Sequence, residues 1–133
     1  MTKISPPTTT PTGNAQPIGV FDSGIGGLTV AAALRELLPA ERIFYVGDTA
    51  RVPYGGKSAA TMERYSFEIS RMLLEEGAKL IVVACNTASA VALEPLRQAF
   101  PQLPILGLEP AVKPAVELTR SGVVGVMATP ATF

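Results

Sequence analysis

Residues 80–90, LIVVACNTASA, organise the predicted fold of this chain. The apolar run before the cysteine predicts a buried strand, Asn86 and Thr87 predict a turn, and the alanine-rich end suits the start of a helix. The only cysteine, Cys85, therefore follows a strand and directly precedes a helix N-terminus. The N–H groups exposed there favour a thiolate over a thiol. In parallel α/β sheets, ligands bind at the carboxyl ends of the strands, so we expect a site around Cys85.

Strand and helix patterns alternate along the chain. Apolar runs predict strands at residues 18–21, 43–46, 80–84, 105–108 and 123–127. Between them, helical apolar faces lie within 30–38 and 62–73, a third helix runs to about Phe100, and a weaker one lies near 109–120. This alternation predicts an α/β fold, a parallel sheet with flanking helices.

The two ends of the chain differ from this pattern. Residues 1–17 hold four prolines and five threonines, which predicts a disordered tail. At the other end, the polar turn at residues 128–133 follows a predicted strand and has no helix after it. We therefore expect the chain to stop within a structural unit.

Composition limits the possible functions. Eleven basic and eleven acidic residues give no net charge, so we expect no nucleic-acid partner. One cysteine and no histidine exclude, within this chain, a disulfide, a Cys–His pair and the usual zinc sites. No apolar run approaches the roughly 18 residues of a membrane span. We expect a cytoplasmic protein without membrane, metal or cofactor.

Small polar residues follow three successive predicted strands: 22–24 (DSG), 47–49 (GDT) and 85–87 (CNT). In a parallel sheet these three ends share one edge. The glycine-rich turn after Ser23 would expose N–H groups that bind phosphate or carboxylate. Asn86 and Thr87 would add donors for a carboxylate and would cap the third helix. The sequence therefore predicts an anion-binding site beside a thiol.

Each candidate also has a purely structural interpretation. A lone cysteine is often a small buried apolar residue, and Asp22 or Asp48 alone would serve as a turn cap. Residues 53–56 (PYGG) are either a simple turn or a substrate-facing loop. The GKS sequence at 56–58 imitates the end of a P-loop, but Arg51 stands where that motif needs glycine. A site thiol would act as a general base or as a nucleophile, and the residues alone leave both roles open.

Three stretches carry a resemblance to a known family. VFDSGIGGLTV (20–30), GDTARVPYG (47–55) and ACNTASA (84–90) closely resemble the bacterial glutamate racemases, in the family's order and spacing. The resemblance covers about residues 18–133. It implies cofactor-independent interconversion of L-glutamate and D-glutamate by two cysteines on opposite faces of the α-carbon. It also implies a role in peptidoglycan and cell-wall biogenesis, and so in cell shape.

The resemblance assigns roles to residues of this chain. Cys85 matches the first of the family's two cysteines, and Asp22 resembles the carboxylate that assists its proton transfers. The residues that match substrate-contact positions are Asp22, Ser23, Tyr54, Gly55, Asn86 and Thr87.

The sequence departs from the family in one respect. The second cysteine belongs to a Gly-Cys-Thr-His motif downstream, in the second of two similar domains, and this sequence stops before it. The resemblance thus makes 18–103 an incomplete first domain and 104–133 the truncated start of the second. We expect this chain alone to be inactive, and its incomplete sheet to promote association, a homodimer included.

Two other interpretations remain open at this point. A racemase of the same superfamily that acts on aspartate or a hydantoin would share these motifs, although the GDTARVPYG loop favours glutamate. A non-catalytic, truncated α/β module would share the fold without the reaction.

Overall fold

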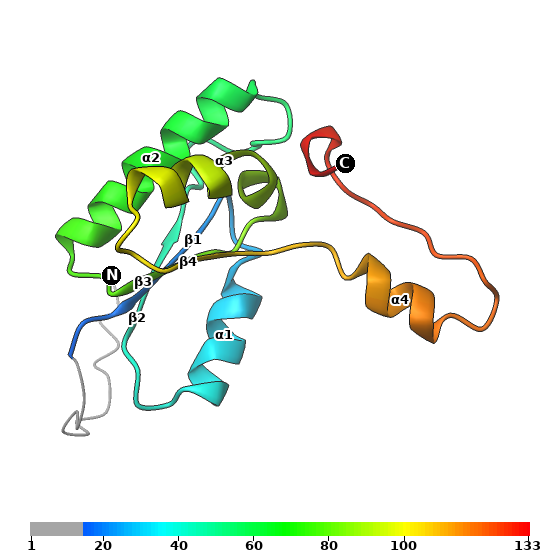
Figure 1. Cartoon of the computed structure of the whole chain (residues 1–133), viewed down its shortest axis with the longest axis horizontal. Coiled ribbons are helices and arrows are strands. Elements are labelled where there is room, and N and C mark those ends of the chain that lie inside the picture. Colours follow the sequence, from blue (N-terminus) through cyan, green and yellow to red (C-terminus); the bar gives the residue numbers. More distant parts are fainter. Residues whose placement is uncertain (1–14) are drawn as a thin grey trace.

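The computed structural model describes residues 15–133, which form an α/β fold on one parallel sheet (Figure 1). Its strands are β1 (Ile18–Asp22), β2 (Ile43–Gly47), β3 (Leu80–Val83) and β4 (Ile105–Gly107), in the spatial order β2-β1-β3-β4. The helices are α1 (Leu28–Leu37), α2 (Ala59–Glu75), α3 (Asn86–Ala99), α4 (Val112–Leu118) and a 3-10 turn, η1 (Pro130–Thr132). The predicted fold class is confirmed. The predicted tail at 1–17 lies mostly outside the described residues.

Helices cover both faces of the sheet, which explains the near-continuous apolar strands. α2 and α3 lie on one face and α1 lies on the other (Figure 1). Side chains of β3 alternate accordingly: Ile81 and Val83 pack in the α2–α3 core, and Val82 packs with α1. Phe21 of β1 pairs with Val83, so both central strands are buried together.

Local sequence signals define both ends of α2. The hydroxyl of Ser58 accepts the Thr61 N–H at 3.2 Å and caps the N-terminus. At the C-terminus, Gly77 has a φ of 82°, a left-handed conformation that glycine adopts without a Cβ clash. Its N–H donates to Leu74 O and that of Ala78 donates to Leu73 O, the two hydrogen bonds of a Schellman motif. Gly77 is therefore the residue that ends α2.

The predicted fifth strand is wrong. Residues 123–127 lie in an irregular segment, and among the described residues no strand pairs with them. Val123 is 76% exposed and Met127 is fully exposed. An apolar run becomes a strand only where a neighbour supplies the hydrogen-bond ladder, and this segment has none. The helix expected near 109–120 is also shorter, at Val112–Leu118.

The division of the chain into domains stays a prediction. β4 falls within the segment 104–133 that we assigned to a second domain, yet it pairs with β3 in the same sheet. Beyond it, α4 projects away from the sheet, and the chain then returns so that η1 lies against α3 (Figure 1).

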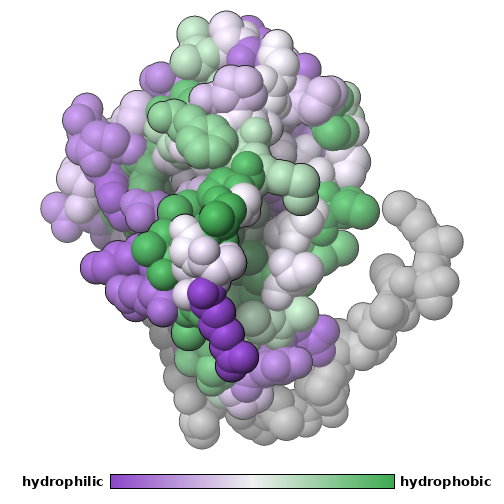
Figure 2. Space-filling view, turned by 90° about the vertical axis from the view of Figure 1, so that its right-hand side faces the viewer, coloured by the Kyte–Doolittle hydropathy of each residue, from purple (hydrophilic) through white to green (hydrophobic). Residues whose placement is uncertain are grey.

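Apolar side chains remain exposed on the α1 side and on the C-terminal segment. Leu37 belongs to the predicted buried face of α1 but is 77% exposed. Leu106 of β4 pairs with Val82, whose side chain packs on the α1 side of the sheet, and is 52% exposed. Figure 2 shows further apolar side chains in the middle of the face that α4 and the C-terminal segment present. Those of this segment are Val112, Val116, Leu118, Val123, Val126, Met127 and Phe133.

Within the described residues, no helix has the length and apolar character that crossing a membrane requires.

We expect Ser70→Ala to stabilise the fold. Among the described residues, Ser70 alone has a buried side-chain oxygen without a hydrogen-bond partner. Removing this hydroxyl from the middle of α2 should raise the free energy of unfolding by about 1 kcal/mol. Urea denaturation measures the change. Ser66→Ala is the matched control, because the Ser66 hydroxyl donates to Met62 O and its loss should stabilise less. A less stable Ser70→Ala chain would contradict this account.

Candidate functional site

Cys85 lies at the carboxyl edge of the sheet, as predicted, and is itself the N-cap of α3. Its Sγ accepts the Ala88 N–H at 3.4 Å and lies 3.3 Å from the Ser23 hydroxyl oxygen. The capping role that we expected of Asn86 and Thr87 is therefore wrong, because Cys85 has the extended backbone of an N-cap and these two residues begin the helix. The thiol is buried and lies at the helix N-terminus.

The glycine-rich turn wraps around the Asp22 carboxylate. Oδ2 of Asp22 accepts the Gly27 N–H at 2.9 Å, and the side chain is buried. A Cβ on Gly27 would lie 2.7 Å from the Cβ of Asp22 and 3.0 Å from that of Ala84. The turn therefore needs glycine at this position. One of the N–H groups that we predicted would bind an external anion instead binds the chain's own carboxylate.

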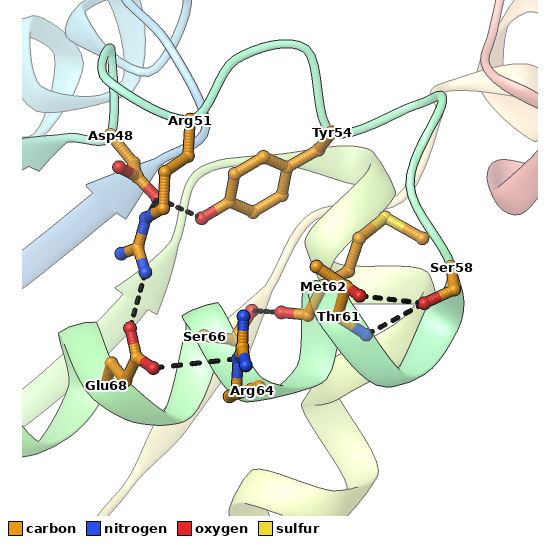
Figure 3. Close-up of polar contacts among 9 residues, drawn as sticks. All are labelled: Asp48, Arg51, Tyr54, Ser58, Thr61, Met62, Arg64, Ser66 and Glu68. Carbon is orange, nitrogen blue, oxygen red and sulfur yellow. Dashed lines mark hydrogen bonds and ion pairs between the residues drawn. The ribbon is translucent and has the colours of Figure 1, made fainter.

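The loop between β2 and α2 closes over a second buried carboxylate (Figure 3). Oδ2 of Asp48 accepts the Tyr54 hydroxyl at 2.5 Å and Arg51 Nε at 2.7 Å. The Tyr54 side chain is only 2% exposed. Burial, and then the hydrogen bond and charge of Asp48, raise the pKa of Tyr54 far above its usual value, so the phenol remains a donor. Any contact of Tyr54 with a ligand would therefore use its backbone.

The remaining predicted site residues, Gly55, Asn86 and Thr87, lie beside the C-terminal segment. That segment was not among the predicted site residues. The Thr87 hydroxyl lies 2.8 Å from that of Thr129, and a Cβ on Gly55 would lie 2.7 Å from Thr129 Cγ2. Asn86 is exposed and lines a surface pocket of about 440 Å³ together with Thr132. The polar turn at residues 128–133 was the available signal, but only the fold brings it to α3.

Residues of three predicted segments, 22–24, 53–56 and 85–87, thus come together at one edge of the sheet. Ser23 contacts Cys85 directly, while Thr87 and Gly55 approach each other through Thr129. Within residues 15–133, no group of three histidine, cysteine, aspartate or glutamate side chains is arranged to hold a metal ion. The edge offers a thiol, hydroxyl groups and an amide, a set suited to binding a small carboxylate and moving a proton.

Comparisons with known proteins agree with this chemistry. The family model described as Asp/Glu/hydantoin racemase matches residues 19–132. The chain is 56% identical over 120 residues to a glutamate racemase of Roseiflexus sp. (strain RS-1), a match that covers 90% of this chain and 44% of that protein.

Solved structures give the same result. Glutamate racemase from Aquifex pyrophilus superposes with a TM-score of 0.78 and 51% identity, over 88% of this chain and 46% of that one. The Escherichia coli glutamate racemase, in complex with L-glutamate and the activator UDP-MurNAc-ala, superposes with a TM-score of 0.81 and 44% identity, over 88% and 44%. The chain therefore spans about half the length of the relatives that it matches.

We expect Gly27→Ala to disrupt the turn around Asp22. The new Cβ would overlap the side chains of Asp22 and Ala84, so we predict a loss of about 1–3 kcal/mol in the free energy of unfolding, measured by urea denaturation. Gly24→Ala is the control, since nothing lies within 4 Å of a Cβ there. Equal effects of the two substitutions would show that close packing at Gly27 does not matter.

Proposed function

The chain belongs to the Asp/Glu/hydantoin racemase family, and we propose that the protein it represents interconverts L-glutamate and D-glutamate. The observation that carries this proposal is the position of the Cys85 thiol, at a strand end, beneath a helix N-terminus and 3.3 Å from Ser23. The relatives named glutamate racemase support the choice of substrate.

The proposed reaction uses two thiols, one to remove the α-proton and the other to donate a different proton. The Cys85 thiolate removes the α-proton, so the C–H bond breaks, an S–H bond forms and the electron pair stays on the substrate as a carbanion. A second thiol, on the opposite face, then donates its proton to this carbanion and becomes a thiolate. The configuration inverts and the two sulfur atoms exchange roles. The reaction needs no cofactor and no metal ion.

Residues around the thiol would bind and orient glutamate. Ser23, Asn86 and Thr87 offer side-chain donors, and Tyr54 and Gly55 offer backbone N–H groups. Asp22 would assist the proton transfers of Cys85 as a nearby carboxylate. Its hydrogen bond from Gly27 supports this role, since it fixes the carboxylate beside the strand end that carries Ser23.

We further propose that the protein acts in the cytoplasm and supplies D-glutamate for peptidoglycan, and thus for cell-wall biogenesis and cell shape. The activator in the Escherichia coli relative, UDP-MurNAc-ala, supports the link to the cell wall.

Because this chain contains one cysteine, we predict that the purified 133-residue polypeptide forms no D-glutamate from L-glutamate, as chiral chromatography would measure. In deuterated water, Cys85 alone should still exchange the α-proton of one glutamate enantiomer with retention, detected by NMR, and Cys85→Ala should abolish the exchange. D-glutamate formation would overturn the two-thiol account. Glutamate binding without exchange would favour a non-catalytic module, and faster exchange with aspartate would change the substrate.

We also propose that the chain self-associates through its exposed apolar side chains, among them Leu37, Leu106 and Val116. Sedimentation velocity should therefore detect dimers or larger species whose fraction increases with protein concentration. A single monomeric species at all concentrations would contradict this proposal.

A further inference from the structure

The Arg51 side chain forms the charged link between α2 and the loop that carries Tyr54 and Gly55. We propose that Arg51 is a positioning residue, which links Asp48 at the end of β2 to Glu68 on α2 and so holds the Tyr54–Gly55 backbone at the substrate site. This inference rests on the proposed function, because it takes that backbone as part of the glutamate site.

On one side, Arg51 binds the carboxylate of Asp48, a residue whose backbone is hydrogen-bonded to the sheet. The Asp48 N–H donates to Asp22 O at 2.9 Å, which continues the pairing of β1 with β2 by one residue. Arg51 Nε then donates to Asp48 Oδ2 at 2.7 Å. The Asp48 side chain is 7% exposed, so its charge is largely removed from water and depends on its protein partners.

On the other side, Arg51 is held by two residues of α2 that are one helical turn apart. Its Nη1 forms a hydrogen-bonded ion pair with Glu68 (Figure 3). Its guanidinium carbon also lies 4.0 Å from the centre of the Tyr65 ring, a cation–π contact. Burial lowers the pKa of Arg51, but the hydrogen bonds to Asp48 and Glu68 outweigh it and raise the pKa, which favours the charged form.

The same carboxylate oxygen that binds Arg51 also binds Tyr54. Asp48 Oδ2 accepts the Tyr54 hydroxyl at 2.5 Å, and the rings of Tyr54 and Tyr65 lie 5.7 Å apart. Without Arg51, the buried Asp48 charge would keep only the phenol as its side-chain partner, so the carboxylate would turn toward water. Tyr54 would lose its acceptor and Gly55, the next residue, would move with it.

Arg64 provides a matched control on the same helix face. Its guanidinium lies 5.2 Å from the Tyr65 ring, and its Nε lies 3.7 Å from Glu68 Oε1. However, its side chain is 66% exposed, and Asp48 is not among its partners in the described structure. Substitution of either arginine by glutamine therefore removes a positive charge near Tyr65. Of these two arginines, however, Arg51 alone binds Asp48.

The direction in which the pKa of Tyr54 changes shows whether the loop stays in place. The Arg51 charge lowers the pKa of Tyr54, so removal of this charge from an intact loop would raise that pKa further. Release of the loop would instead expose the phenol and lower its pKa toward the usual value of about 10. In NMR titrations with ¹³C-labelled tyrosine, we expect Arg51→Gln to lower the pKa of Tyr54. Glu68→Gln should change this pKa in the same direction.

Arg51→Lys separates geometry from charge. Lysine keeps the charge but lacks the planar fork that reaches Asp48 and Glu68 together, so we expect it to release the loop as Arg51→Gln does. Arg64→Gln should leave Tyr54 unchanged. Circular dichroism and the amide spectrum away from the loop verify that each variant is folded. An unchanged or raised Tyr54 pKa in a folded Arg51→Gln chain would overturn the proposal, as would full rescue by lysine.

Glutamate binding to the same chains supplies the functional test. In NMR titrations with L-glutamate and D-glutamate, Arg51→Gln should weaken binding on the order of tenfold, whereas Arg64→Gln should not. Equal affinity in a folded Arg51→Gln chain with a released loop would overturn the positioning role. If the unmodified chain binds neither enantiomer, the proposed substrate fails instead, and the Tyr54 titration still decides whether Arg51 holds the loop.

Discussion

The parallel pairing of β1 with β3 is the constraint on which the rest of the structure depends. Phe21 opposite Val83 fixes the register, and Ser23 and Cys85 each follow two residues later along the chain. Ser23 and Cys85 are 62 positions apart in the chain, yet this register brings their side chains into contact. A slip of one residue would reverse the faces of the strand and separate them.

Buried polar groups at this edge are satisfied mostly by the chain itself. Asp22 binds the N–H of Gly27, while Asp48 binds Tyr54 and Arg51. A buried carboxylate without partners would destabilise the fold, so these hydrogen bonds hold the turns in one geometry. The thiol of Cys85 differs, because sulfur, a weaker hydrogen-bonding atom than oxygen, meets a backbone N–H at 3.4 Å and a hydroxyl at 3.3 Å. It is the group at this edge that the proposed reaction uses.

Sequence patterns predicted elements well where local signals and burial agreed. The apolar run before Cys85 became β3, since its residues are both strand-forming and buried. They failed where the outcome depended on distant partners. Residues 123–127 have the composition of a strand, but no strand within residues 15–133 pairs with them. The cap of α3 was assigned to Asn86 and Thr87, but the extended backbone at the end of β3 gave that position to Cys85.

The sequence by itself determined the α/β class, the order of the elements from β1 to α4 and the candidate residues at three strand ends, because hydrophobic period and turn chemistry are local properties. Only the tertiary structure decided which of these residues meet. It turned the Tyr54 side chain into the core, brought Thr129 to Thr87, and used Arg51 to tie a loop to α2. These outcomes depend on sheet register and helix packing, which combine segments that no local pattern connects.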